Sequence, residues 1–261
     1  MAHMPLSVII ITLNEEANLP RALKSVAWAD EVIVVDSGSL DRTQQIACEL
    51  GARVFERPWT GYGQQKNFAQ TLAKNDWILN LDADEVVSHS LAHEIQATLQ
   101  NAAQNPTAPL GYYIPRKTFY LGRWIRYGGW YPNYLMRLAN KNHASWSEPP
   151  VHEAWEIQGP TAELQAPLLH FSFNSISDQV LTNLRFAQLG SQALLQKGRR
   201  PSLVQALLRP IGKFIETYLI KRGFLDGTAG LIISLNAAYS VFMKYSFLLE
   251  DRIRIHENSD Y

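Results

Sequence analysis

The sequence predicts an α/β fold, with a mixed, mostly parallel sheet that carries helices on both faces, and a helical region at the C-terminal end. Short, continuous runs of apolar, β-branched residues recur through the first hundred positions, and helix-like stretches separate them. From about residue 177 to 250 the pattern is helical alone. Such runs are typical of strands buried on both faces, and their alternation with helices is typical of parallel sheets with right-handed crossovers.

The first hundred residues supply strands and helices in alternation. We expect strands at 8–11, 31–35, 52–55 and 77–81, and helices at about 15–28, 41–51, 64–73 and 88–101. Asn14 is expected to cap the first helix and Gly51 to end the second, because Asn and Gly favour those positions. The carboxyl ends of the strands should form the ligand-binding edge of the sheet.

The pattern changes near residue 110. The segments 112–121, 134–138, 151–157 and 168–173 are the expected strands of a mixed-sheet extension. We therefore expect a first domain over residues 5–175, with halves at 5–100 and 101–175, and a helical region over 176–261. Residues 1–4 are expected to be an added extension, because a second Met stands at position 4 and the segment lacks the charged start of a signal peptide.

The composition excludes several classes of protein. Apolar residues make up 46% of the 261 and charged residues 18%, so the chain can bury a core and is not a disordered protein. Lys and Arg together number 24, as do Asp and Glu, and a net charge of zero argues against a nucleic-acid-binding protein. The single Cys48 excludes an internal disulfide and any multi-cysteine metal site, and it suits a reducing compartment.

Carboxylates follow the second and fourth expected strands. Asp82 and Asp84 stand two residues apart directly after a buried strand, where both can reach one divalent ion that bridges a diphosphate. They could equally be the acidic start of the helix at 88–101. Asp36 begins the segment Asp36-Ser37-Gly38-Ser39 after the second strand. Its carboxylate can accept a hydrogen bond from a ribose hydroxyl or a base, and Gly38 permits close approach of a ligand. A capped helix start explains the segment as well.

Three motifs at successive strand ends resemble those of family 2 glycosyltransferases with the GT-A fold. They are Thr12-Leu13-Asn14-Glu15, the segment from Val35 through Asp36-Ser37-Gly38-Ser39 to Asp41 and Thr43, and Asp82-Ala83-Asp84-Glu85. Gln65-Lys66-Asn67-Phe68 and Val151-His152-Glu153 resemble more specifically the bacterial lipopolysaccharide inner-core glucosyltransferases, which add β-1,4-glucose to the first heptose. The resemblance covers about residues 5–250.

The resemblance implies a donor site for a UDP-sugar. Glu15 and Asp36 would hold the uridine, Asp82 would contact the ribose side, and Asp84 would ligate Mg²⁺ or Mn²⁺. The remaining donor-binding residues would be Thr12, Asn14, Ser37, Gly38 and Lys66.

The resemblance also places a catalytic base and a late metal ligand after the donor motifs. Glu153 would be the base and His170 would complete the metal site. Because His152-Glu153 stands where related enzymes have Glu-Asp, His152 and Glu148 are alternatives for the base. Each histidine, taken alone, could equally be structural.

Aromatic and basic side chains are concentrated between residues 112 and 134, with nine aromatic residues and no acidic one. Aromatic faces stack on sugars and Arg binds phosphate or carboxylate, so the stretch suits an acidic or phosphorylated oligosaccharide acceptor. The candidate acceptor residues are Arg116, Arg123, Arg126, Trp130 and Tyr131. Packing within an antiparallel sheet is the other explanation for part of these aromatics.

The C-terminal region combines basic and apolar residues. Seven Lys or Arg and only Glu216 as an acid occur in 197–222, with Leu203, Leu207, Ile211, Phe214, Ile215 and Tyr218 at helical spacing. This pattern predicts an amphipathic helix on an anionic membrane surface, interrupted at Pro210. Residues 228–249 could span a membrane by length, but Asn236, Ser240 and Lys244 form one polar stripe, which favours a helix in the interface or against a neighbour. A soluble helical subdomain is the third possibility.

These observations together predict an inverting, metal-dependent glycosyltransferase that moves glucose from UDP-glucose to a heptose of a lipid-anchored lipopolysaccharide core. The enzyme is expected to be cytoplasmic and peripheral on the inner face of the inner membrane. A polyprenyl-phosphate glycosyltransferase and a non-catalytic nucleotide-sugar-binding membrane scaffold are the alternatives.

Overall fold

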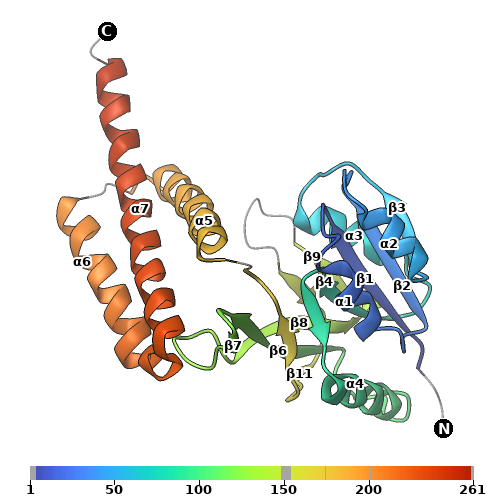
Figure 1. Cartoon of the computed structure of the whole chain (residues 1–261). Coiled ribbons are helices and arrows are strands. Elements are labelled where there is room, and N and C mark those ends of the chain that lie inside the picture. Colours follow the sequence, from blue (N-terminus) through green and yellow to red (C-terminus); the bar gives the residue numbers. More distant parts are fainter. Residues whose placement is uncertain (1–3, 148–153, 174, 200–201, 260–261) are drawn as a thin grey trace. The chain divides into compact units, whose positions relative to one another are not determined.

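The computed structural model describes residues 4–147, 154–173, 175–199 and 202–259, with side chains up to Glu250. It contains two compact units (Figure 1). The first comprises Met1–Lys117 and Pro132–Phe171, and the second comprises Thr118–Tyr131 and Ser172–Tyr261. Residues 118–131, which the sequence assigns to the first domain, therefore group with the C-terminal helices.

The first unit is built on a mixed sheet whose N-terminal half is parallel. In the order β3-β2-β1-β4 the strands are Arg53–Glu56, Glu31–Asp36, Leu6–Thr12 and Trp77–Asp82. The sheet continues through β8 (Asn133–Asn140), antiparallel to β4, then β6 (Gly111–Tyr120), β12 (Leu168–His170) and β5 (Glu85–Val87). Thr161–Glu163 (β11) pairs with β6, and Ala144–Trp146 (β9) pairs with Trp155–Ile157 (β10). Arg123–Trp124 (β7), in the second unit, pairs with Phe119 and Tyr120 at the end of β6. The predicted mixed, mostly parallel sheet is confirmed.

Helices cover both faces of the parallel strands, as predicted. Leu19–Ser25 (α1), Thr43–Glu49 (α2) and His89–Ala102 (α4) pack on one face, and Tyr62–Leu72 (α3) packs on the other. Alternate residues of β1 pack on opposite faces of the sheet. Val8 and Ile10 belong to the core on the side of α1, α2 and α4, whereas Ile9 belongs to the core on the side of α3. All three are fully buried, which explains why the strand has an unbroken apolar sequence.

Some predicted boundaries were wrong. Helix α1 begins at Leu19 and not at Glu15, because Asn14 has a left-handed backbone (φ 56°) and does not cap a helix. Its amide instead donates to Ser39 Oγ at 2.8 Å, and its Oδ1 accepts from the Leu40 amide at 2.8 Å. Strand β12 ends at His170 rather than at residue 173. Of the predicted strand 151–157, residues 151–153 lie outside the described residues.

The second unit is mainly helical. Its helices are Ile176–Gln196 (α5), Leu203–Phe214 (α6) and Gly227–Ser259 (α7), with a π-helical segment at Ile215–Ile220 and a 3₁₀ turn at Gly223–Asp226. Helix α7 packs against both α5 and α6 (Figure 1).

Lys197 and Arg199, which open the predicted amphipathic helix, are not part of α6. Helix α5 ends at Gln196, and α6 starts only at Leu203, where the Ser202 side chain accepts from the Gln205 amide. Pro210 lies inside α6, and the α-helix gives way to the π-helical segment five residues later. The start at 197 and the interruption at Pro210 were therefore wrong, while the apolar helical spacing was right.

The polar stripe of α7 faces α5. Asn236 Nδ2 donates to Gln179 Oε1 at 2.6 Å, and Ser240 Oγ donates to the Asn183 carbonyl at 3.4 Å. In the described part of the chain one segment, Gly223–Glu250, is long and apolar enough to cross a membrane by length and composition. Two of its polar residues, Asn236 and Ser240, thus have partners on α5 of the same unit.

Candidate active site at the carboxyl ends of the strands

The parallel register gathers the predicted donor residues at one edge of the sheet. Thr12 lies opposite Asp36 in the β1–β2 pair, and Ile11 lies opposite Asp82 in the β1–β4 pair. Residues that are 24 and 71 positions apart in sequence therefore meet, because the strands run the same way and end together.

Asp36 organises the loop that follows β2. Its carboxylate is fully buried and accepts five hydrogen bonds. The amides of Gly38 (3.0 Å) and Ser39 (2.8 Å) donate two of them. Side chains donate the other three: Thr12 Oγ1 (2.9 Å), Gln44 Nε2 (2.7 Å) and Ser39 Oγ. Burial alone would raise the pKa of this carboxyl, but these hydrogen bonds outweigh burial and lower it. The carboxylate is ionised near neutral pH, and its own loop occupies its acceptor sites. A contact of Asp36 with uridine stays a prediction.

The loops after β1 and β2 are joined by hydrogen bonds. The Glu15 amide donates to Thr43 Oγ1 at 2.8 Å, and the Ser37 amide donates to the Thr12 carbonyl at 2.9 Å. Gly38 has φ 94°, and a Cβ added there would meet no heavy atom within 4 Å. The space above Gly38 is thus open, as an approach of a ligand to this loop would require.

Glu15 lies in an acidic environment. Burial raises the pKa of its carboxyl, the hydrogen bond from Asn18 lowers it, and repulsion by Asp84, Asp41 and Asp82 raises it further, so the pKa is raised overall. Several carboxylates close together favour the arrival of a cation, which would reduce their mutual repulsion.

Asp82 is held by two cations that sequence reasoning did not single out in this role. Arg137 of β8 forms ion pairs with Asp82 and, at 2.7 Å, with the fully buried Glu85. Lys66 Nζ is 4.0 Å from Asp82 Oδ1, and the Asp82 amide donates to Glu85 Oε2 at 3.0 Å. Burial would raise the pKa of Asp82, but attraction to Arg137 and Lys66 lowers it well below its usual range. The lone Arg in the run Tyr-Leu-Met-Arg-Leu-Ala was the available signal for a buried partner.

Asp84 and His170 are brought together by strand pairing. His170 of β12 lies opposite Glu85 of β5, and the Phe171 amide donates to the Asp84 carbonyl at 3.0 Å. His170 Nε2 is 3.2 Å from Asp84 Oδ2. The two predicted metal ligands, 86 positions apart in sequence, are therefore neighbours.

These two side chains fit a divalent cation that also binds a diphosphate. Mg²⁺ is usually held by one or two carboxylates together with substrate phosphates, and Asp84 supplies one such carboxylate. Among the described residues no cluster of three or more His, Cys, Asp or Glu has metal-binding geometry. The acidic surroundings of Glu15, Asp82 and Asp84 favour positive charge at this position.

The segment Gln65-Lys66-Asn67 of α3 connects several parts of the site. Gln65 Nε2 donates to Ser37 Oγ at 3.1 Å, and Asn67 exchanges two hydrogen bonds with the backbone of Trp146, at 3.0 and 2.9 Å. The buried Lys66 lies with Nζ 4.4 Å from the Trp146 ring. One turn of helix thus links the loop after β2, the end of β4 and the hairpin of β9 and β10.

The predicted base lies outside the described residues. Glu153, His152 and Glu148 all fall in 148–153, between β9 and β10. The described ends of this connection meet, because the Ser147 amide donates to the Ala154 carbonyl at 2.9 Å and Trp146 pairs with Trp155. The two described ends of this connection therefore lie beside Trp146, which contacts Lys66, a predicted donor-binding residue.

The predicted acceptor residues are divided between the two units. Arg116 is in the first unit, 3.6 Å from Glu85. Arg123 and Arg126 are in the second, where Arg123 Nη1 donates to the Asp226 carbonyl at 2.8 Å and the Arg126 amide donates to Asp226 Oδ2 at 3.0 Å. Trp130 packs with Tyr120 and Phe173, and Tyr131 also belongs to that unit. At least Arg123 and Trp130 thus have a structural role.

Comparisons with known proteins agree with this geometry. The family model described as Glycosyl transferase family 2 matches residues 7–148, more than half of the chain. A glycosyltransferase of Rickettsia bellii is 37% identical over 258 residues, which covers 94% of this chain and 86% of the relative. The lipopolysaccharide core biosynthesis glycosyltransferase LpsC of Rhizobium meliloti is 27% identical over 252 residues, covering 92% of this chain and 90% of the relative. The crystal structure of S. aureus TarS 1–349 in complex with UDP-GlcNAc has a TM-score of 0.50 at 15% identity, over 97% of this chain and 92% of that one.

Proposed function

The chain belongs to the family 2 glycosyltransferases and has their GT-A fold, and on that premise we propose that it transfers glucose from UDP-glucose, in β linkage, to a heptose of a lipopolysaccharide inner core. The observation that carries this proposal is the convergence of Thr12, Asp36, Asp82 and Asp84 at one edge of the sheet. The relative LpsC, named for lipopolysaccharide core biosynthesis, supports the choice of acceptor.

The donor lies along that edge in this proposal. Glu15 and the loop shaped by Asp36 receive the uridine, and the open space above Gly38 admits it. Asp82, oriented by Arg137 and Lys66, accepts from the ribose side. Thr12, Asn14 and Ser37 support the loops through the hydrogen bonds described above.

Transfer proceeds as one direct displacement. The acceptor hydroxyl attacks the anomeric carbon, the bond from that carbon to the diphosphate oxygen breaks, and the hydroxyl proton passes to Glu153. Asp84 and His170 would hold Mg²⁺ or Mn²⁺, whose charge stabilises the leaving diphosphate. A single displacement inverts the anomeric centre, so an α-linked donor gives a β-linked product.

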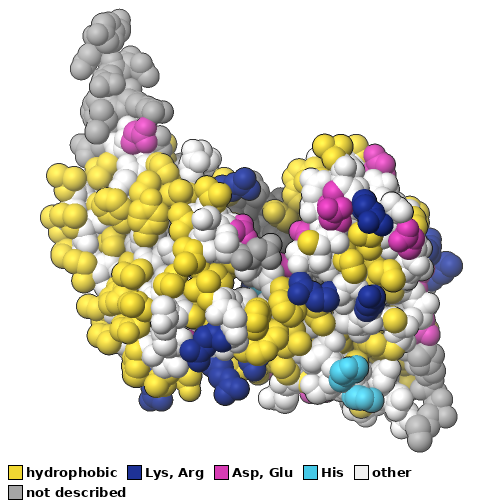
Figure 2. Space-filling model, in the orientation of Figure 1, with side chains coloured by type: hydrophobic (Ala, Val, Ile, Leu, Met, Phe, Trp, Pro, Cys, Tyr) yellow, Lys and Arg dark blue, Asp and Glu magenta, His cyan; other side chains and the backbone are white. Residues whose placement is uncertain are grey.

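We place the enzyme peripherally on the inner face of the inner membrane. Helix α6 leaves Leu207 and Ile211 61% and 56% exposed, and Leu235 and Phe242 of α7 are also exposed. Figure 2 shows hydrophobic side chains gathered over these helices on the face in view. An exposed apolar surface of this extent suits a membrane interface, and the polar contacts of α7 with α5 favour a helix that lies on the bilayer over one that crosses it.

A transfer assay tests the proposal. The full chain is incubated with UDP-[¹⁴C]glucose and Mn²⁺, together with either heptose-bearing core lipid or polyprenyl phosphate. We expect label in the core lipid, with a β linkage. Label in the polyprenyl lipid instead would identify the alternative enzyme, and absence of label in both, with UDP still bound, would identify a non-catalytic binder.

A further inference from the structure

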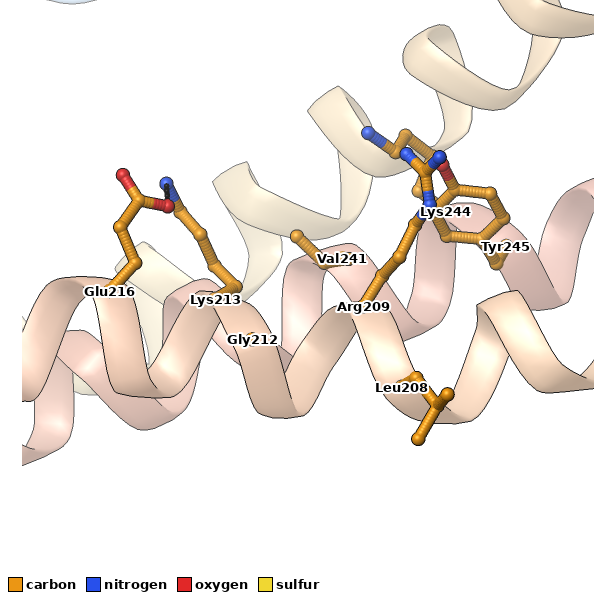
Figure 3. Close-up of a pocket in the computed structure, with 8 residues that line it drawn as sticks. All are labelled: Leu208, Arg209, Gly212, Lys213, Glu216, Val241, Lys244 and Tyr245. Carbon is orange, nitrogen blue, oxygen red and sulfur yellow. Dashed lines mark hydrogen bonds and ion pairs between the residues drawn. The ribbon is translucent and has the colours of Figure 1, made fainter.

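A cavity of about 480 Å³ lies between α6 and α7, and three of the eight residues that line it are cations (Figure 3). Arg209 and Lys213 of α6 and Lys244 of α7 face it. The Arg209 and Lys244 side chains both lie near the Tyr245 ring (Figure 3). The other lining residues are Leu208, Gly212, Glu216 and Val241. All belong to the C-terminal unit.

The positive charge of this cavity is only partly balanced. Glu216, the single carboxylate in the lining, pairs with Lys213 at 3.0 Å and also with Lys221. Within the described part of the chain Arg209 and Lys244 have no carboxylate partner and contact the Tyr245 ring, at 5.2 and 5.5 Å from its centroid. Burial, followed by repulsion from Arg209 and Lys213, lowers the pKa of Lys244. Three cations that face one cavity stabilise a multiply charged anion there.

The shape and chemistry of the cavity favour a phosphate group. Arg presents a planar fork of donors that matches phosphate oxygens, and each Lys adds a compact charge. Gly212 leaves the floor of the cavity open, because a Cβ there would meet no heavy atom within 4 Å. Leu208 lines the same cavity and is 61% exposed, so a ligand that joins a phosphate to an apolar group also finds an apolar contact.

We propose that the cavity between α6 and α7 is a phosphate-binding site, separate from the donor site. The phosphate can come from a lipid headgroup or from a soluble phosphorylated compound, and the chemistry of recognition is the same for both. The proposal rests on Arg209, Lys213 and Lys244 and does not depend on the donor or acceptor proposed above.

Two variants of the full chain with the same change in charge test this site. The cavity variant is Arg209→Gln/Lys213→Gln/Lys244→Gln. The control is Arg185→Gln/Lys197→Gln/Arg199→Gln, which removes three exposed cations elsewhere on the same unit. Inorganic phosphate is titrated at constant ionic strength, and the melting temperature is measured. We expect phosphate to stabilise the wild type and the control, with affinity about tenfold or more lower in the cavity variant.

Equal stabilisation of all three proteins, or of none, would overturn the proposal. Any phosphate bound at the donor site stabilises both triple variants equally, so it does not change the difference between them. Should the triple variant not fold, Glu216→Gln tests the same idea in the opposite direction. Removing the competing carboxylate should tighten phosphate binding, and unchanged or weaker binding would contradict the site.

Vesicles identify the source of the phosphate. Phosphatidylcholine vesicles with and without phosphatidic acid are compared for both triple variants. A loss of phosphatidic-acid-dependent binding in the cavity variant beyond that of the control supports the site and assigns a lipid headgroup. Equal vesicle binding by the two variants, together with lost binding of inorganic phosphate in the cavity variant, supports the site and assigns a soluble phosphate compound.

Discussion

The base of the proposed reaction is one residue among three, and single substitutions separate them. Glu153→Gln should keep the fold and donor binding but lower turnover by about 10²-fold or more, because a positioned base contributes on that scale. His152→Ala and Glu148→Gln, measured in parallel for kcat, should have smaller effects. A near-wild-type kcat for Glu153→Gln would move the role to whichever of the other two loses activity.

Asp36 makes stability depend on pH. Its pKa is lowered in the folded state, so its contribution to the free energy of unfolding is fully present above the unfolded-state pKa of about 4 and is lost as the pH falls further. Asp36→Asn should cost about 1–3 kcal/mol at pH 7, because an amide cannot replace an acceptor of five hydrogen bonds. Urea unfolding of both proteins should show this difference shrinking below about pH 4. A difference that is constant with pH would contradict the assignment.

Arg137 is the residue whose loss should most destabilise the first unit. Arg137→Met removes the cation 2.7 Å from the fully buried Glu85 and leaves Arg116, at 3.6 Å, and the Asp82 amide as its partners; breaking a buried ion pair costs about 3–5 kcal/mol. The double variant Arg137→Met/Glu85→Met should recover part of this loss, because it leaves no buried carboxylate without its partner. Denaturant unfolding measures both. Suppose instead that the double variant lost as much stability relative to Arg137→Met as Arg137→Met loses relative to the wild type. Packing rather than charge would then be the cause.

At the scale of elements, the sequence pattern predicted the strands better than their surroundings. Continuous apolar runs identify β1, β2 and β4 because these strands are buried on both faces. Asn14 was misread as a helix cap, because its actual partners, Ser39 and Leu40, are 25 and 26 residues away. Local propensity cannot report a loop that is held by a second loop.

The same limit applies to the site. Residues at the ends of parallel strands could be grouped from sequence, since the fold class alone brings such ends together. The neighbourhood of Asp84 and His170 could be proposed only through resemblance, because it depends on the pairing of β5 with β12. The role of Arg137 was missed for a similar reason, since β8 lies beside β4 although more than fifty residues separate them.

The exposed apolar face of α6 is expected to contribute to membrane binding. Leu207→Gln/Ile211→Gln should lower binding to anionic vesicles by about tenfold or more at high salt, where screening weakens the basic residues but apolar burial persists. The fold should be unaffected, because both side chains are exposed. Leu40→Gln/Leu50→Gln, which alters two exposed leucines of the first unit, is the matched control. Equal binding by the two double variants would exclude α6 from the membrane contact.

In the whole molecule, the residues proposed for donor binding and those proposed for membrane contact lie in different units. The proposed donor residues all lie in the first unit, and the exposed apolar helices all lie in the second. Residues 197–261 contain ten Lys or Arg against six Asp or Glu, whereas residues 1–196 contain fourteen against eighteen. Charge and apolar surface therefore favour membrane contact through the C-terminal unit, and substitutions there should leave the affinity for UDP unchanged.

In the proposed function, the carboxyl edge of β1, β2 and β4 binds a nucleoside diphosphate together with a divalent cation. Calorimetric titration of UDP, with and without Mn²⁺, into the wild type and Asp84→Asn tests it most directly. Asp84→Asn keeps the shape of the side chain and removes its charge, and Glu163→Gln on the exposed β11 is the control. We expect Mn²⁺-dependent UDP binding by the wild type and the control, and loss of that dependence in Asp84→Asn. Equal Mn²⁺-dependent affinity in all three proteins would contradict it.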